Sequence, residues 1–299
     1  MEQFRFDGRV AIVTGAGRGI GRAYARLLGA RGAVVVVNDL GGSIAGEGAD
    51  AAPAEQVASE ITAGGGTAIA DGSDVAAVDG AQHLVATAVE RFGRIDVVVN
   101  NAGIMRWAGM PDVDAENLEQ HLAVHVGGAF NTTRAAWPHM TEQGYGRIVM
   151  TASAGMFGHP QNTSYATAKA AMLGLTNSLA VTGAAHGIKV NVIAPAAMTR
   201  MAGPGVVDDE GGPMDPALVA PMVAYLAHED CPVNGEVYAA GAGRFSRIFV
   251  ATTPGWLASE GAPSLEDVAA HWDAINDEAG YTLPADLMDW SAGFTAHLR

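Results

Sequence analysis

Seven short runs of β-branched and apolar residues recur along the first 240 residues of the chain, and longer stretches with helical periodicity separate them. Near-continuous apolar strands that alternate with helices are typical of a parallel sheet covered on both faces. A chain of 299 residues is long enough to bury such a core. We therefore predict an α/β fold with a doubly wound, parallel, seven-stranded sheet. Its strands are expected at 10–14, 34–38, 67–70, 95–100, 147–151, 189–194 and 236–240.

A glycine-rich segment, 14–21, directly follows the first expected strand and opens the first expected helix. Its glycines let the backbone turn sharply and approach a pyrophosphate, which the free N–H groups and positive end of the helix stabilise. The strand before it, the helix after it and an acid at the end of the second strand make the motif specific. The segment predicts a Rossmann-type dinucleotide site, with Gly15, Gly17, Gly19 and Gly21 around the pyrophosphate.

Asp39 is the acid that follows the second expected strand, 18 positions after Gly21. A carboxylate at this place accepts hydrogen bonds from both hydroxyls of the adenosine ribose and repels the extra phosphate of NADP. The predicted cofactor is therefore NAD. Two alternatives stay open: Asp39 only forms a turn after the strand, or Arg18 attracts a 2′-phosphate.

Charge and cysteine content exclude several classes of function. The chain has 17 Lys and Arg against 32 Asp and Glu, a net charge of −15 without a basic cluster, so we expect no nucleic-acid partner. The single Cys231 cannot form an internal disulfide, and no Cys/His spacing suggests a metal site. Neither an apolar N-terminal region nor an apolar run of membrane-spanning length is present. We expect a cytoplasmic protein without a membrane partner.

The strand and helix pattern stops after Gly243. We therefore expect a dinucleotide-binding domain over 1–243 and a C-terminal extension over 244–299. Within the extension, Ser264 and Asp267 have the spacing of a capping box that opens a helix. The extension is expected to pack on the domain or at an oligomer interface.

The spacing of Gly15, Gly19 and Gly21, the run 100–103 (Asn-Asn-Ala-Gly) and the Tyr165 to Lys169 pair together resemble the short-chain dehydrogenase/reductase family over roughly residues 6 to 243. The runs 37–42, 92–104 and 133–137 are similar to the branch that holds the (3R)-hydroxyacyl-CoA dehydrogenase module of the peroxisomal multifunctional β-oxidation enzyme and bacterial single-domain relatives. The resemblance implies an NAD-dependent oxidation of a secondary alcohol in a homodimer or homotetramer. Helices expected over 116–141 and 165–185 would form the interface. The cofactor residues expected from the motif and the resemblance are Gly15, Gly17, Arg18, Gly19, Ile20, Gly21, Asp39, Leu40, Asp74, Val75, Asn100, Ala102, Gly103, Thr151, Tyr165, Lys169, Pro195, Ala197, Met198 and Thr199.

Tyr165 is the expected general acid and base. A tyrosine with a pKa of about 10 is a poor base at neutral pH unless a nearby cation stabilises its phenolate. Lys169 lies four residues later on the same helix face, where its ammonium group lowers that pKa and holds the nicotinamide ribose. The alternative is an ordinary surface pair on a helix.

The remaining catalytic positions of the family do not match. Its serine falls at Ala152, with Ser153 one residue late, and its asparagine falls at His125. We expect Ser153 to take over through a local bend of the backbone. His125 either supports a water chain to Lys169 or is a satisfied helix histidine. If Ser153 does not take over, the chain is a catalytically impaired NAD-binding protein.

Apolar residues are expected to face the substrate after the fourth, fifth and sixth strands. A pocket of methionines and aromatic residues suits a bulky hydrophobic alcohol or ketone, of the hydroxysteroid or 3-hydroxyacyl-CoA type. An acyl-CoA would also need cations for its phosphates, and the candidates are Arg106, Arg200, Arg244 and Arg247. The expected pocket residues are Met105, Trp107, Met156, Phe157, Met198 and Met201.

Overall fold

The computed structural model describes residues 3–203, 205–258 and 261–298. The chain divides into two compact units, Met1–Arg247 and Ile248–Arg299. The boundary lies four residues beyond the one expected after Gly243, because one more strand follows that residue.

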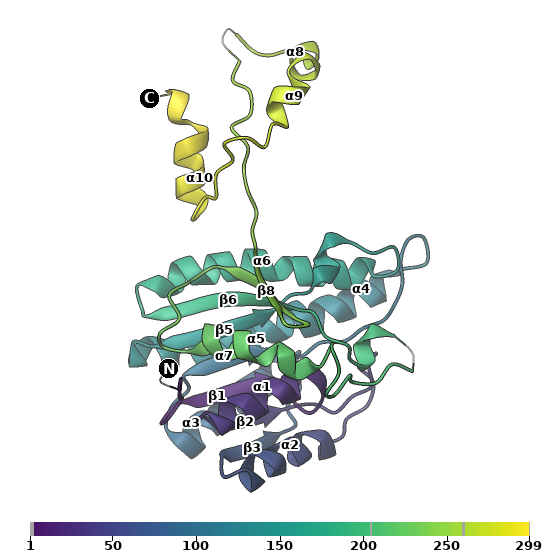
Figure 1. The fold of residues 1–299 in the computed structure, drawn as a ribbon, viewed down its shortest axis with the longest axis vertical. Coiled ribbons are helices and arrows are strands. Elements are labelled where there is room, and N and C mark those ends of the chain that lie inside the picture. The colour runs from purple at the N-terminus through teal and green to yellow at the C-terminus, as the bar shows by residue number, and fades with distance from the viewer. Residues whose placement is uncertain (1–2, 204, 259–260, 299) are drawn as a thin grey trace. The chain divides into compact units, whose positions relative to one another are not determined.

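Unit 1 is a doubly wound α/β domain, as predicted (Figure 1). In the described part of the chain the sheet has eight strands in the order β3-β2-β1-β4-β5-β6-β7-β8. The first seven are paired in parallel and coincide with the predicted strands to within two residues at each end. They are β1 (Val10–Thr14), β2 (Val34–Asn38), β3 (Thr67–Asp71), β4 (Val97–Asn100), β5 (Gly146–Thr151), β6 (Ile188–Pro195) and β7 (Val237–Gly241).

The eighth strand, β8 (Arg244–Ile248), corrects the prediction of a seven-stranded sheet. Two residues, Ala242 and Gly243, connect it to β7, and so short a connection joins only antiparallel strands. Both residues have positive φ, at 50° and 73°, as the tight turn of a β-hairpin requires.

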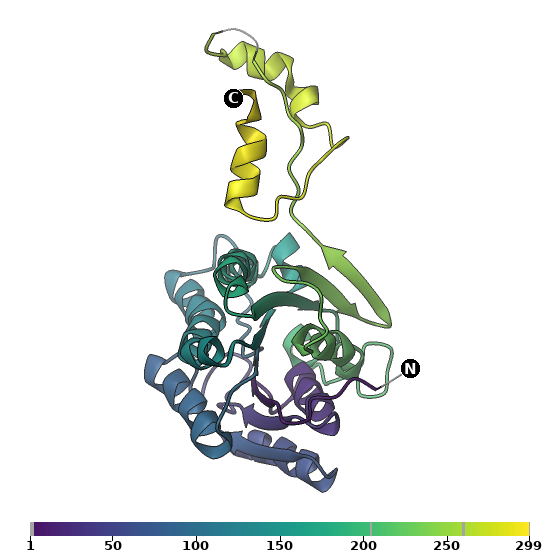
Figure 2. The ribbon, with the colours of Figure 1, turned by 90° about the vertical axis from the view of Figure 1, so that its left-hand side faces the viewer.

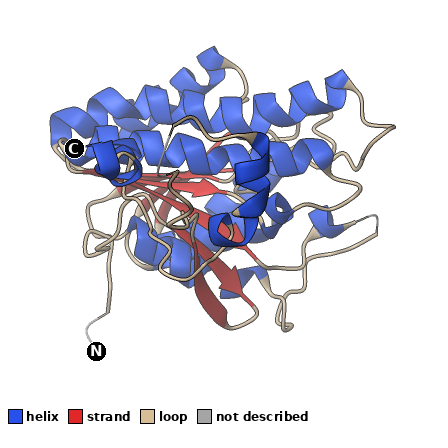
Figure 3. Ribbon diagram, turned by 90° about the horizontal axis from the view of Figure 1, so that it is seen from above, coloured by secondary structure: helices blue, strands red, loops and turns tan. Residues whose placement is uncertain are grey.

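Helices cover both faces of the sheet, and in Figure 2 the sheet lies between them. Figure 3 shows the twist of the sheet, whose strands are coloured red. On one face α1 contacts α2 and α7, and on the other α3 contacts α5, with α6 beside them. The helices of unit 1 are α1 (Gly19–Ala30), α2 (Ala52–Ala63), α3 (Val78–Phe92), α4 (Ala115–His121), α5 (Gly128–Gln143), α6 (Thr163–Ala184) and α7 (Ala220–Ala227), with 3₁₀ turns η2 (Ala154–Phe157), η3 (Arg200–Ala202) and η4 (Pro216–Leu218).

The helix expected over 116–141 is interrupted. Between α4 and α5 the chain forms a π-helix, η1 (Leu122–Gly127). Insertions of this kind are rare and frequently mark functional sites. His125 lies within it, and His121 is the last residue of α4.

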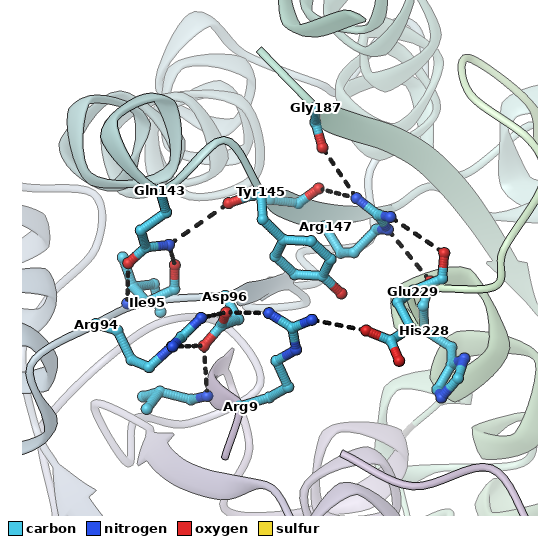
Figure 4. Close-up of polar contacts among 12 residues, drawn as sticks. Arg9, Arg94, Ile95, Asp96, Gln143, Tyr145, Arg147, Gly187, His228 and Glu229 are labelled. Carbon is cyan, nitrogen blue, oxygen red and sulfur yellow. Dashed lines mark hydrogen bonds and ion pairs between the residues drawn. The ribbon is translucent and has the colours of Figure 1, made fainter. Parts of the chain in front are cut away.

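A polar cluster fastens the amino-terminal ends of the strands (Figure 4). The fully buried Asp96 carboxylate accepts hydrogen bonds from Val10 N at 2.9 Å, from Arg9 Nη1 at 3.0 Å and from Arg94 Nε at 2.7 Å. The Arg9 guanidinium lies 3.9 Å from the centroid of the Tyr145 ring. These contacts join the amino-terminal ends of β1 and β4, on the opposite side of the sheet from the carboxyl ends of the strands.

Unit 2 has no buried side chain among its described residues, 248–258 and 261–298. The predicted capping box is present, because Ser264 Oγ accepts a hydrogen bond from Asp267 N and the Asp267 carboxylate accepts one from Ser264 N. No helix in the described part of the chain is long and apolar enough to cross a membrane. The helices of this unit are α8 (Leu265–Ala270), α9 (Trp272–Ile275) and α10 (Leu287–Phe294), followed by η5 (Ala296–Leu298).

Candidate active site

A cavity opens at the carboxyl ends of the parallel strands, where the strand order reverses between β1 and β4. Ligands bind at such switch points in doubly wound sheets. Most of the predicted cofactor residues line this cavity. They are Gly15, Arg18, Gly19, Ile20, Gly21, Asp39, Leu40, Asp74, Val75, Ala102, Gly103, Thr151, Tyr165, Lys169, Pro195 and Thr199.

The other predicted cofactor residues, Gly17, Asn100, Ala197 and Met198, lie outside that lining. Asn100 is buried, and its Nδ2 donates to Thr133 Oγ1 at 3.0 Å. Ala197 packs against the core. The sequence therefore predicted where the cavity lies, but it did not distinguish the residues that line the cavity from those buried behind them.

The glycine loop has no room for side chains. A Cβ atom on Gly15 would lie 2.8 Å from Ala102 Cα, and one on Gly21 would lie 2.2 Å from Gly15 O. Asn101 was not among the predicted cofactor residues, but it follows β4 directly and holds this loop: its Nδ2 donates to Thr14 O at 2.9 Å and to Gly15 O at 3.0 Å. A loop of this shape, opening a helix with free N–H groups, fits the pyrophosphate of a dinucleotide.

Asp39 lies beside the glycine loop. Its two carboxylate oxygens accept hydrogen bonds from Gly17 N and Gly41 N, each at 2.7 Å. The bond from Gly17 N ties the end of β2 to the loop after β1. The bond from Gly41 N forms the turn expected from the alternative in which Asp39 is only a turn residue. The Arg200 guanidinium is close enough to Arg18 and Asp39 to be affected by their charges. Burial is the main cause that lowers the pKa of Arg200, the positive charge of Arg18 lowers it further, and the negative charge of Asp39 raises it.

The side chains of Ser153 and Tyr165 meet beside Gly155, where an added Cβ atom would lie 3.3 Å from Ser153 Oγ and 3.0 Å from Tyr165 Cε1. Burial raises the pKa of Tyr165, and a hydrogen bond with Ser153 partly offsets that rise. Ser153 Oγ also accepts a hydrogen bond from Gly155 N at 3.0 Å, which caps η2. The family's serine position, Ala152, is 1% exposed and continues the strand, because its N–H donates to Ile193 O. The chain turns after Ala152, and this turn places Ser153 beside Tyr165.

Lys169 lies one helical turn beyond Tyr165 on α6, and its Nζ is 5.5 Å from the centroid of the tyrosine ring. The ammonium group donates to Thr151 O at 2.8 Å. Lys169 is 4% exposed, and burial lowers its pKa to about 7. Tyr165 and Lys169 thus line the cavity together and are not a surface pair on a helix.

His125 and His121 form a stacked pair against the tyrosine. Their rings are 5.8 Å apart and nearly parallel, and the His125 ring meets the Tyr165 ring edge-on at 5.4 Å. His125 Nε2 lies 2.9 Å from Ile104 O and 3.2 Å from Ile104 N. Burial, and then the nearby Lys169, holds the pKa of His125 well below its usual value, so the ring is neutral. Its Nδ1 is buried with no partner among the described residues.

His121 was missed by the sequence analysis. It is buried, its Nδ1 lies 2.8 Å from Asn117 O, and its Nε2 accepts from Arg106 N at 3.3 Å. The two histidines thereby hold the loop after β4 beside the tyrosine. A pair of histidines four residues apart on a helix was the only available signal.

Exposed apolar side chains lie on the loops that follow β4 and β5. Phe157 on η2 is 73% exposed, and Met110 in the loop after β4 is 78% exposed. These two loops meet: Thr163 N donates to Ala108 O at 3.2 Å, and the Trp107 ring lies edge-on to His159 at 5.8 Å. Of the predicted substrate residues, Met105 is buried, whereas Met201 lines the cavity itself.

Further lining residues were not among the predicted cofactor residues. Ala152, Arg200 and Met201 were predicted for other roles, as the family's serine position, a candidate cation for CoA phosphates and a substrate residue. The others come mostly from loops that close on the cavity only in the folded chain: Asn38, Gly42, Ser43, Gly46, Ser73, Ala76, Asn101, Ile104 and Val124. Within residues 3–203, 205–258 and 261–298, no group of three His, Cys, Asp or Glu side chains could hold a metal ion.

Comparisons with known proteins agree with this geometry. A family model for short chain dehydrogenases matches residues 9–206. The chain is 44% identical over 273 residues to a short-chain type dehydrogenase/reductase of Mycobacterium tuberculosis, a match that covers 91% of this chain and 95% of that protein. It is 42% identical over 298 residues to the peroxisomal multifunctional enzyme type 2 of Mus musculus. That match covers 99% of this chain but only 40% of the multifunctional enzyme.

A solved structure extends the comparison to a bound complex. The structure of a 7α-hydroxysteroid dehydrogenase, complexed with NADH and 7-oxo glycochenodeoxycholic acid, superimposes with a TM-score of 0.70 at 27% identity. The match covers 80% of this chain and 95% of that one. From its sequence, its sheet and the cavity at the switch point, this chain belongs to the short-chain dehydrogenase family and is an oxidoreductase of that family.

Proposed function

We propose that the chain is an NAD-dependent dehydrogenase that interconverts a hydrophobic secondary alcohol and its ketone. The observation that carries the proposal is the meeting of Ser153 with Tyr165, one turn from the buried Lys169, at the wall of the cavity that the glycine loop lines. A pure binding protein has no need of a tyrosine whose hydroxyl is held by a second hydroxyl beside a buried lysine.

Each of these residues has a distinct task in the proposed reaction. Ser153 donates a hydrogen bond that holds the reacting oxygen, and Tyr165 exchanges the proton with that oxygen. Lys169, as the nearest cation, stabilises the phenolate form of the tyrosine. A nicotinamide cofactor bound by the glycine loop would supply the hydride to the ketone or accept it from the alcohol. His121 and His125 are neutral and keep the tyrosine ring and the loop after β4 in position.

The preference for NAD over NADP is proposed from Asp39. Its carboxylate lies at the end of β2 and is fixed by two backbone N–H groups, so a 2′-phosphate there would meet a negative charge. The neighbouring Arg18 is the feature that argues for NADP, and its Nη1 is buried with no partner among the described residues. Titration of the protein with both cofactors tests the choice, and tighter binding of NADP would overturn it.

The substrate class is proposed from the exposed apolar side chains on the loops that follow β4 and β5 and from the named activities of the relatives. A hydroxysteroid and a 3-hydroxyacyl-CoA are the two candidates. The net charge of −15 favours the uncharged skeleton, since the phosphates of CoA need cations. Arg106 interacts with Gln120 and Glu116, and Arg247 pairs with Glu236, which leaves fewer cations for those phosphates.

The test is NADH formation from NAD with matched panels of hydroxysteroids and 3-hydroxyacyl-CoA thioesters, followed by absorbance. Turnover of either panel, abolished in Tyr165→Phe, supports the proposal. The second candidate function, a catalytically impaired NAD-binding protein, is motivated by Ala152. NAD binding without turnover of any compound in either panel would favour it.

We also propose a homodimer or homotetramer and a cytoplasmic location. The interface is proposed on the outer faces of α5 and α6, where Phe130 and Val181 are exposed beside a groove that Trp137 and Leu179 line. No described residue of unit 2 is buried, so we propose that this unit packs on the domain or at this interface. Light scattering of the whole chain tests the oligomeric state. The same measurement on a chain ending at residue 247 tests whether unit 2 contributes to the interface.

A further inference from the structure

The amino-terminal end of α1 carries a carboxylate from a distant part of the chain. Gly19 N donates to Asp208 Oδ2 at 3.0 Å, although 189 residues separate the two in sequence. The other oxygen, Asp208 Oδ1, accepts from Arg200 N at 3.2 Å. The helix has no capping side chain at Arg18 and no acidic residue in its first turn. Asp208 is therefore the anion that stabilises this helix end.

The loop that carries Asp208 connects β6 to α7 and is held down at a second point. Glu210 Oε1 accepts a hydrogen bond from Arg22 Nη1 on α1 at 2.5 Å. Within the loop, Asp209 N donates to Met198 O, and Met214 N donates to the Asp209 carboxylate. The loop is thus fastened to the first two turns of α1 by two acids and braced internally by a third.

Asp208 lines a cavity next to the one proposed for the cofactor, and its carboxylate occupies an N–H group, that of Gly19, which lines both. The pyrophosphate of a dinucleotide bound to this fold lies on the first N–H groups of the helix after β1. The Gly19 N–H is the first of these, and Thr199 Cγ2 lies 3.4 Å from where a Gly19 Cβ would be. One N–H cannot serve both anions, and the like charges of a carboxylate and a pyrophosphate repel each other at this range.

We propose that Asp208 is an internal competitor of the cofactor's pyrophosphate, which must displace it from α1 on binding. This inference rests on the proposed dinucleotide site. The displaced loop also carries Thr199, Arg200 and Met201, which line the cavity next to the catalytic groups. Binding of the dinucleotide therefore changes the substrate side of the site through Asp208. The Asp208 carboxylate acts on the Arg200 guanidinium. The charged residues that line a cavity with Asp208 are Arg22, Arg26, Glu60, Glu210 and Asp215.

The test compares three ligands on the whole protein: NADH, ADP-ribose and adenosine, each titrated against wild type and Asp208→Asn. The asparagine keeps the size of the side chain and removes its charge. We expect the Kd of NADH and of ADP-ribose to fall by about two- to fivefold, the range of one charge at a helix end. The Kd of adenosine, which has no phosphate, stays unchanged. Glu90→Gln on α3, which removes a distant exposed acid, is the charge-matched control and leaves all three values unchanged.

A second variant, Glu210→Ala, removes the tether to Arg22 but leaves Asp208 in place, and we expect the Kd of NADH to change in the same direction but by less. Unchanged or weaker NADH binding in Asp208→Asn would show that Asp208 is a permanent cap and would overturn the inference. An equal gain for adenosine would also overturn it, since a general opening of the cavity would then be the cause. If wild type and variants bind neither NADH nor ADP-ribose, the proposed function itself fails.

Discussion

Replacing Ser153 by alanine tests whether this residue does the work of the serine missing at Ala152. The substitution removes two contacts: the hydrogen bond with Tyr165 and the one that Ser153 Oγ accepts from Gly155 N. Loss of one hydrogen bond to a reacting oxygen lowers turnover by about a hundred- to a thousandfold, or roughly 3 to 4 kcal/mol. Loss of the cap on η2 costs about 1 kcal/mol of stability, so the protein stays folded.

The pH dependence of the same variant gives a second, independent readout. The bond from Ser153 lowers the pKa of Tyr165, so without it that pKa moves further up. The limb of the pH–rate profile that reports the tyrosine in alcohol oxidation should therefore shift to higher pH. Ser153→Thr keeps a hydroxyl and should recover part of the rate.

The assay is kcat for alcohol oxidation, with the Kd of NADH measured in parallel. Ser164→Ala is the matched control, because Ser164 adjoins Tyr165 on α6 and its buried hydroxyl has no partner among the described residues. We expect NADH binding to be unchanged in both variants and kcat to fall only in Ser153→Ala. A rate in Ser153→Ala within threefold of wild type would refute the replacement of the family's serine by its neighbour.

Three further predictions concern the cofactor, the buried lysine and the polar cluster. Asp39→Ala removes charge-assisted bonds to the ribose and should weaken NAD binding about tenfold or more, measured by titration, with NADP affected less. Lys169 has a pKa of about 7 against 10.5 in the unfolded chain, so unfolded protein binds the extra proton between these values and stability rises with pH across that window. Denaturation at several pH values should show up to about 1.4 kcal/mol per pH unit from this group, and Lys169→Met should lose that slope. Asp96→Ala leaves two arginines without their buried partner and should lower the free energy of unfolding by about 3 to 5 kcal/mol, whereas Asp7→Ala, at an exposed pair, should change it little.

Local sequence was sufficient for the parallel strands, because most of them are short runs of buried apolar residues. The exception is β3, in which four of the five residues are exposed or half-buried. Local sequence was not sufficient for β8. That strand has the sequence Arg-Phe-Ser-Arg-Ile, exposed at four of its five positions, and it exists because the hairpin turn at Ala242 returns the chain to the edge of the sheet. Pairing with β7 determines the strand, and pairing cannot be read from five polar and apolar residues.

The candidate site shows the same division. Glycines and the Tyr165 to Lys169 pair act through their neighbours in sequence, so their spacing was informative. Asn101 and Asp208 act on the glycine loop from positions 86 and 189 residues away, and only folding brings them there. His121 belongs to the second group, since its value depends on stacking against His125 and on the loop after β4.

The π-helix η1 makes the site sensitive to chain length as well as to residue type. A residue added to an α-helix rotates everything before it by about 100° relative to everything after it. Deleting one residue from Leu122–Gly127 would let α4 and α5 fuse into one regular helix while leaving the sheet and its core as they are. His121 would then turn away from the tyrosine ring, and the loop after β4 would lose one of its two anchors. Single-residue deletions in this stretch should therefore yield a folded protein without turnover, although every remaining residue that lines the cavity keeps its identity.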